Sequence, residues 1–337
     1  MIEYFRCGWH STINAAAPEV SLMDPYNMNA YLITMGAATL VVCALFYYFL
    51  RKAPGIKKEK ALGLSLCVLI LGPVLAIVGG KLLYFIFRMA YVTKQGIGKY
   101  LLSFRTEEMS YYGAMAGVVL AVFLSAKICG ADARRVLNTF APAGALMAAI
   151  ARFAEYFLYP TGTGLFLEQV IPFPLAVSIV WSEDYTECVL AVFFLEGLMS
   201  LVAFVMSLIH KDEPRRMLRT LFYLCLPQVL LESLRTDAIN WLFVHLEQLV
   251  CFLFVEGVLV WYAFRLGKDK FASWVPALTG LGVCCLIIVA EFLIDGKWLI
   301  GGSRVSLWIV YPVMAAALGL IAFMENRANK ALYSLSK

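Results

Sequence analysis

Long apolar runs dominate the chain, and short polar segments separate them. Nine runs are long enough to cross a bilayer as helices, which takes about 20 apolar residues each. They cover residues 29–50, 61–87, 110–128, 136–158, 187–209, 217–234, 240–264, 272–293 and 305–325. The runs do not alternate polar and apolar positions with a period of two, as the strands of a membrane barrel would. The pattern therefore predicts an all-α, polytopic membrane helical bundle.

The composition excludes a soluble domain. Hydrophobic residues make up 62% of the 337-residue chain and charged residues only 15%, whereas soluble domains have about 45–50% and about 25%. The mean hydropathy is +0.79. The net charge of +5 lies in short clusters between the apolar runs, which is typical of loops that face an anionic lipid leaflet. We therefore expect contact with a membrane and none with nucleic acid.

The distribution of Lys and Arg predicts the orientation, because basic residues concentrate on the cytoplasmic side of membrane proteins. The odd-numbered connections between spans, together with the C-terminal tail, hold 18 of the 28 basic residues. We therefore expect the N-terminus outside and the C-terminus in the cytoplasm. Residues 1–28 then form an outer segment. Residues 159–187, which contain no Lys or Arg, form an outer loop or a re-entrant segment.

Ionisable residues inside membrane spans are rare and are functional candidates by default. Arg152 and Glu155 are three residues apart, so they lie on one helix face and can neutralise each other. Glu232 and Arg235 repeat this spacing. Each pair is either an internal ion pair that makes insertion tolerable, or part of an outer-leaflet anion site in which two arginines grip a phosphate. Lys81 either joins such a site or extends its ammonium group to the interface.

Other chemistry has little support in the sequence. No metal-ligand spacing and no glycine-rich phosphate loop is present, so we expect neither a metal nor a cofactor. Gly113 and Gly117 form a small-x-x-x-small pair, which is typical of close helix packing in membranes. The adjacent Tyr111 and Tyr112 are either part of an interfacial aromatic belt or phenol donors to a ligand.

Five motifs follow one another along the chain: GGKLLYFIF, MSYYGAMAGVVLA, APAGALMAAIARFAEYF, FFLEGL and LLESLR. In their order and spacing they resemble the signature segments of the prolipoprotein diacylglyceryl transferase family. The resemblance covers roughly residues 25–266. It implies a seven-helix transferase-like transmembrane core at 29–266, followed by two additional transmembrane helices and a cytoplasmic tail at 267–337.

The resemblance also implies an activity in the bacterial plasma membrane. Members of this family move a diacylglyceryl group from phosphatidylglycerol to the thiol of a lipobox cysteine in a preprolipoprotein, and glycerol phosphate leaves. The residues that match catalytic positions are Arg152, Arg235, Glu232 and, in place of the family's histidine, Tyr112. The residues that match substrate-binding positions are Lys81, Tyr84, Gly113, Glu155 and Glu196.

The chain departs from the family pattern at several of these positions. Tyr112 stands where the family has histidine, Glu155 where it has asparagine, and Gln228 where it has the first arginine of the sixth-span motif. Three hypotheses remain open. The chain is an active, divergent transferase, a non-catalytic or altered-acceptor paralogue that binds anionic lipid, or a polytopic transporter. The lack of an internal sequence repeat counts against the transporter.

Overall fold

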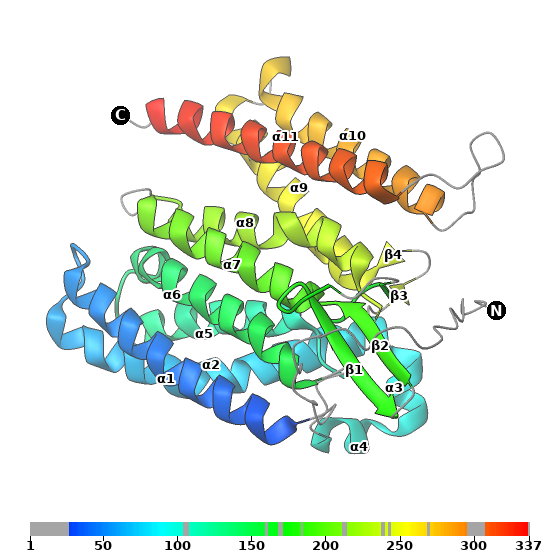
Figure 1. The fold of residues 1–337 in the computed structure, drawn as a ribbon. Helices are drawn as coiled ribbons and strands as arrows, with labels where there is room; N and C mark the ends of the chain where they lie inside the picture. The colour runs from blue at the N-terminus through cyan, green and yellow to red at the C-terminus, as the bar shows by residue number, and fades with distance from the viewer. Residues whose placement is uncertain are drawn as a thin grey trace.

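The computed structural model describes residues 27–103, 108–158, 161–167, 171–182, 185–210, 214–236, 240–241, 244–267, 270–294 and 307–335. Within these ranges the chain is a bundle of helices with two short strand hairpins at one end (Figure 1). The segment expected outside the membrane before the first span falls almost wholly on residues 1–26, which lie outside the described residues.

Nine helices in the described ranges are long and apolar enough to cross a bilayer. They are α1 (Met28–Lys52), α2 (Lys58–Phe87), α5 (Tyr111–Ile128), α6 (Ala133–Ala154), α7 (Val192–Ile209), α8 (Arg216–Leu231), α9 (Leu246–Gly267), α10 (Phe271–Ile294) and α11 (Leu307–Ser334). Short helices α3 (Met89–Gln95) and α4 (Ile97–Leu102) follow α2, and the 3-10 turns η2 (Glu155–Leu158) and η3 (Glu232–Leu234) extend α6 and α8. The predicted all-α polytopic bundle is confirmed.

Polar caps fix where three of the helices begin. The side chains of Asn27 and Asp132 each accept a backbone hydrogen bond of 3.0 Å at the start of α1 and α6. At the start of α5, the Ser110 hydroxyl oxygen accepts one from the Gly113 backbone N–H at 3.3 Å. Such caps satisfy backbone donors that have no partner within the helix. The Ser110 cap places Tyr111 and Tyr112 in the first turn of α5, which matters for the site described below.

Glycines bring α2 and α5 into backbone contact. A Cβ atom added at Gly113 would lie 2.8 Å from Leu83 Cβ, and one added at Gly79 would lie 3.2 Å from Gly117 Cα. Both separations are shorter than an ordinary van der Waals contact, so only glycine fits at this spacing. The geometry agrees with the close-packing interpretation of the small-x-x-x-small pair.

The predicted helix boundaries are wrong at three places. The last span was expected to end at residue 325, but α11 continues to Ser334. The other two lie at the hairpin end of the bundle. A span was expected from residue 187, but α7 begins at Val192 because β2 (Tyr185–Leu190) pairs antiparallel with β1 (Ala176–Ser182). A span was expected from residue 240, but β3 (Asn240–Trp241) and β4 (Val244–His245) precede α9. A short apolar run does not by itself distinguish a strand from the first turn of a helix.

Three of the basic connections meet at the opposite end of the bundle. The Lys60 ammonium group donates to the Gly130 carbonyl at 2.6 Å, which joins the α1–α2 and α5–α6 connections. The Asn138 amide donates to the Pro214 carbonyl at 2.9 Å, and the Arg134 Nε donates to the same carbonyl at 3.3 Å. These two bonds bring in the α7–α8 connection. The basic residues of these three connections therefore lie at one end of the bundle.

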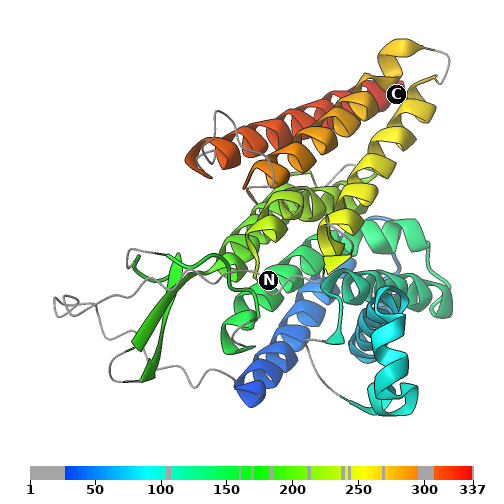
Figure 2. The same cartoon turned by 90° about the vertical axis from the view of Figure 1, so that its right-hand side faces the viewer.

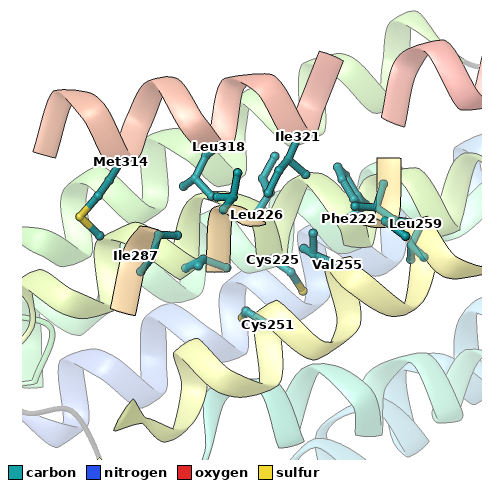
Figure 3. Close-up of a cluster of buried hydrophobic side chains, with 14 of the residues drawn as sticks. Phe222, Cys225, Leu226, Cys251, Val255, Leu259, Ile287, Met314, Leu318 and Ile321 are labelled. Carbon is teal, nitrogen blue, oxygen red and sulfur yellow. The ribbon is translucent and has the colours of Figure 1, made fainter. Parts of the chain in front are cut away.

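The helices α10 and α11 lie on the side of the bundle away from α1 and α2 (Figures 1 and 2). They share a buried apolar cluster with α8 and α9 (Figure 3). Its members include Phe222, Cys225, Leu226, Cys251, Val255, Leu259, Ile287, Met314, Leu318 and Ile321. A second cluster joins α1, α2, α5 and α6. The charged site lies between these two cores, where α6, α7 and α8 meet.

Candidate active site

Arg152 is the most deeply buried cation of the site. It lies in the last turn of α6, and only 2% of its side-chain surface is exposed. Its Nη1 atom lies 2.7 Å from Glu155 Oε1, one turn further along the chain, and its Nε lies 3.3 Å from Glu196 Oε2 on α7. A guanidinium this far from water requires such carboxylates to offset its desolvation.

Arg235 approaches the same two carboxylates from the end of η3. Its Nη1 atom lies 3.0 Å from Glu196 Oε2 and 3.3 Å from Glu155 Oε2. Each glutamate therefore bridges both arginines. The backbone next to Arg235 is held in place because the Thr236 N–H donates to the Thr163 carbonyl at 3.0 Å. The structure thus brings together four of the residues singled out in the sequence.

Gln228 on α8 connects this quartet to Glu232. The Gln228 amide nitrogen donates to Glu196 Oε1 and, at 2.9 Å, to Glu232 Oε2. All three side chains are 2–3% exposed. Gln228 occupies the position where the family pattern has an arginine, and it supplies hydrogen bonds there without adding positive charge.

Tyr111 and Glu247 complete the surroundings of Arg152. The Arg152 guanidinium carbon lies 3.7 Å from the centre of the Tyr111 ring, which is a cation–π arrangement. Glu247 on α9 accepts hydrogen bonds from the Tyr111 backbone N–H at 2.8 Å and the Ser110 hydroxyl at 3.0 Å. Its other oxygen lies 3.8 Å from Arg152 Nη2. We call Arg152, Arg235, Glu155, Glu196, Gln228, Glu232 and Glu247 the arginine–glutamate cluster.

A cavity of about 10 Å³ opens beside the cluster, with room for about one water molecule. Its lining includes Arg152, Glu196, Gln228 and Ser200, together with apolar side chains of α7 and α8. Arg152 Nη2 is buried and has no hydrogen-bond partner among the described residues. A guanidinium residue and a carboxylate residue therefore both line this cavity.

Tyr112 lines the same cavity but belongs to the apolar core. It is 5% exposed and packs in the cluster shared by α8 to α11. Its ring stands edge-on to that of Tyr111, with 5.2 Å between the ring centres. Of the two tyrosines, Tyr111 is the one whose ring contacts Arg152.

Lys81 and Tyr84 lie apart from the arginine–glutamate cluster. The Lys81 ammonium group donates to the backbone carbonyls of Tyr100 at 2.7 Å, Leu101 at 3.2 Å and Ser103. Tyr84 stacks on Tyr100, with 6.0 Å between the ring centres. Burial raises the pKa of Tyr100 to about 12, so its hydroxyl stays protonated and donates to the Lys81 carbonyl at 2.7 Å. In this arrangement Lys81 holds the C-terminal end of α4.

A model of the prolipoprotein diacylglyceryl transferase family matches residues 19–264, most of the chain. The chain belongs to the prolipoprotein diacylglyceryl transferase family. No curated protein matches the chain at a significant level. Family membership supports transferase chemistry in lipoprotein biosynthesis, acting on a lipid donor and a prolipoprotein in a multi-pass membrane protein.

This family member carries its whole arginine–glutamate cluster inside the matched segment, which ends at residue 264 near the end of α9. The helices α10 and α11 lie beyond the match. Sequence reasoning missed the parts played by Tyr111, Gln228 and Glu247. Glu247 was recognisable as an ionisable residue inside a span, but its partners lie on α5 and α6. The local sequence pattern does not predict those contacts.

Proposed function

We propose that this chain transfers a diacylglyceryl group from phosphatidylglycerol to the thiol of a lipobox cysteine, at the outer face of the bacterial plasma membrane. The observation that supports the proposal is that Arg152 and Arg235 contact the same two carboxylates. Both arginines are buried, and both lie within the segment that the family model matches. Two guanidinium groups at one place suit a reaction whose leaving group is a phosphate ester.

The chemistry forms one bond and breaks one. A sulfur–carbon bond forms between the cysteine and the glyceryl carbon that carries the phosphate, and the carbon–oxygen bond at that carbon breaks. The electron pair of the broken bond leaves with glycerol phosphate, whose growing negative charge the arginines stabilise. Such preorganised charge in a dry site is often the largest contribution to catalysis.

The thiol must lose its proton to become a good nucleophile. Glu232 is the carboxylate we assign to that step. Its hydrogen-bond donor is the neutral amide of Gln228, 2.9 Å away, and both Gln228 and Leu231 beside it line the cavity. A proton accepted by Glu232 therefore arrives beside the cavity, where we place the phosphate.

The arginines must exchange partners before they can hold a phosphate. Glu155 and Glu196 contact both of them, so the donor lipid displaces at least one carboxylate. Arg152 Nη2 has the least to give up: it makes no hydrogen bond within the described chain, and its ion-pair partner, Glu247 Oε2, lies 3.8 Å away. We assign this atom the first contact with the phosphate.

The direct test uses purified protein in phosphatidylglycerol micelles with a lipobox peptide, and follows the mass of the peptide. We expect a mass gain on the cysteine. Arg152→Gln should slow it by roughly 10–100-fold, the value of one charge-assisted hydrogen bond. Lys330→Ala, a change of an exposed residue on α11, is the control and should leave the rate unchanged. Equal rates in both variants would remove Arg152 from the site.

A lipid-binding paralogue without transfer is the second candidate. Tyr112 in the position of the family's histidine favours it, because a tyrosine with an ordinary pKa near 10 is a poor base at neutral pH. Phosphatidylglycerol binding without any mass gain, in a preparation where a known transferase is active, would favour this alternative over the enzyme.

A further inference from the structure

The short helices α3 and α4 pack against one end of α2, in a part of the molecule that the proposed reaction does not use. This is the end of α2 opposite the basic connections (Figure 1). A small core joins the three helices, because Tyr84 on α2, Val92 on α3 and Tyr100 on α4 are each 0–7% exposed. We call residues 88–103 the α3–α4 segment.

Lys81 fixes the position of this segment. Its buried ammonium group donates to the carbonyls of Tyr100, Leu101 and Ser103, at the C-terminal end of α4. The last carbonyls of a helix have no partner within the helix, and a buried ammonium group needs acceptors to offset its desolvation. The two needs are met together, so the α3–α4 segment is tied to the end of a membrane-spanning helix.

The surface of the α3–α4 segment that faces away from α2 is apolar. Its large apolar side chains that are 46–90% exposed are Met89, Tyr91, Ile97, Leu101 and Leu102. Exposed apolar side chains gathered in one segment mark a surface that contacts a membrane or another molecule. The spanning helix α2 ends at Phe87, directly before α3, so these side chains stand at the depth where bilayer and water meet.

Three cations lie among these apolar side chains. Lys94 and Lys99 are exposed and Arg88 is partly exposed, and the ion pairs of the described residues include none of them. Residues 60–106 contain no Asp or Glu. Cations beside apolar side chains at the bilayer surface are typical of helices that bind anionic lipid. The charge of the segment therefore complements a phosphate-bearing headgroup.

We propose that the α3–α4 segment lies in the headgroup layer and binds anionic phospholipid there through Arg88, Lys94 and Lys99. The apolar side chains enter the edge of the acyl region, and the cations pair with lipid phosphates. This binding does not depend on the reaction proposed above. Its consequence is a local excess of anionic lipid on the side of the membrane toward which the last turn of α6 carries Arg152.

The test places a bimane fluorophore on α4 and measures which lipid touches it. Gly98 is exposed, and a side chain added there would meet nothing within 4 Å, so Gly98→Cys in a cysteine-free background carries the label. The full chain is placed in phosphatidylcholine vesicles with a nitroxide quencher on the acyl chain of either phosphatidylglycerol or phosphatidylcholine. We expect labelled phosphatidylglycerol to quench at a roughly 5-fold lower mole fraction, the value of one cation near an anionic surface. In 1 M salt the preference should disappear, because the Debye length falls to about 3 Å.

Matched variants assign the preference to the segment's own cations. Lys94→Gln/Lys99→Gln should abolish the preference of the Gly98 reporter for phosphatidylglycerol. Lys57→Gln/Lys58→Gln removes two exposed lysines at the other end of α2 and should keep it.

A second reporter position controls for the bulk lipid composition. Gly36 on α1 is also exposed and has the same free space, but residues 28–50 contain no Lys or Arg. Bimane at Gly36→Cys should therefore be quenched equally by the two lipids. Equal quenching at Gly98, or a preference there that survives the loss of Lys94 and Lys99, would overturn the inference. So would a Gly98 reporter that neither lipid quenches, because the surface then faces water or a protein.

Discussion

At the scale of single residues, the contact between Arg152 and Glu155 was predictable from the sequence. Their contacts with Glu196 and Arg235 were not. The spacing of Arg152 and Glu155 predicts a contact one turn apart, and the structure has it at 2.7 Å. The contacts with Glu196 and Arg235 join residues 39 or more positions away, and they depend on how three helices pack. The resemblance to a family selected these residues, but periodicity alone could not pair them.

Tyr111 gives the first prediction. Its ring lies against the Arg152 guanidinium, a contact worth about 0.5–2 kcal/mol. Tyr111→Ala should therefore slow transfer by about 2- to 30-fold, whereas Tyr111→Phe keeps the ring and should stay close to the wild-type rate. The peptide mass-gain assay measures both. A Tyr111→Phe defect as large as that of Tyr111→Ala would mean that the hydroxyl, and not the ring face, supports Arg152.

Tyr112 gives the second prediction. Since it packs in an apolar core, Tyr112→Phe should leave most of the transfer rate. A loss of about 10²-fold or more, the size of a general acid–base contribution, would show instead that its phenol takes part in the reaction. Tyr112→His should raise the rate, because imidazole restores the family's residue at the cavity wall. No gain from a folded Tyr112→His protein would show that the surrounding geometry has diverged.

At the scale of elements, apolar run length predicted the helices well and the hairpins not at all. An apolar run of about 20 residues crosses a bilayer as a helix, because only a helix satisfies all its backbone hydrogen bonds within the run. All nine spans in the described residues were therefore predictable. The strands β2 and β4 sit at the starts of runs predicted as helix, where backbone groups pair across a hairpin. Each pairs with the strand directly before it in the chain, β1 or β3, but a short apolar run does not by itself distinguish such a strand from the first turn of a helix.

The attachment of α11 to α8 gives the third prediction. Arg219 contacts the fully buried Glu325 through Nε at 3.1 Å and Nη2 at 3.2 Å, and Tyr223 and Tyr262 donate to the same carboxylate. Glu325→Gln should lower the free energy of unfolding by about 3–5 kcal/mol, because it removes the carboxylate that compensates a buried guanidinium. Reversible unfolding in mixed micelles measures the loss.

A matched substitution controls that measurement. Glu256 is also a buried glutamate, but both its oxygens are without a hydrogen-bond partner within the described residues. Glu256→Gln should therefore be neutral or stabilising. If both variants behave alike, the loss at Glu325 has no specific link to Arg219. The contrast bears on our proposal that residues 267–337 form a module added to the transferase-like core at 29–266 and fixed to it by this ion pair.

The packing of α2 against α5 gives the fourth prediction. A Cβ at Gly117 would lie 2.6 Å from the Leu75 carbonyl carbon, while one at Gly72 would meet nothing within 4 Å. Gly117→Ala should destabilise the protein by about 1–3 kcal/mol, the usual cost of overpacking. Gly72→Ala should instead be neutral or stabilising, since alanine favours helix. The same unfolding assay measures both changes in stability. Equal effects of Gly117→Ala and Gly72→Ala would contradict the backbone contact between α2 and α5.

At the scale of the whole molecule, the proposed orientation gives the fifth prediction. The basic connections meet at one end, and the hairpins lie at the other (Figure 1). We propose that the basic end is cytoplasmic. Lys58 and Lys94 are both exposed lysines. Lys58 begins α2, and Lys94 lies near the end of α3, which follows the other end of α2. In a cysteine-free background, an impermeant thiol reagent added to intact cells should label Lys94→Cys and spare Lys58→Cys. The reverse pattern would invert the topology.

The central claim is that the reaction joins a glyceryl carbon to sulfur, and the linkage in the product tests it most directly. Peptide modified by the wild-type protein in phosphatidylglycerol micelles is treated with mild alkali to remove the acyl chains and then weighed by mass spectrometry. A thioether survives this treatment, so the account predicts that one glyceryl group stays on the cysteine. Recovery of the unmodified peptide would mean either that an acyl group had been transferred or that no transfer had occurred. Both results would contradict the account.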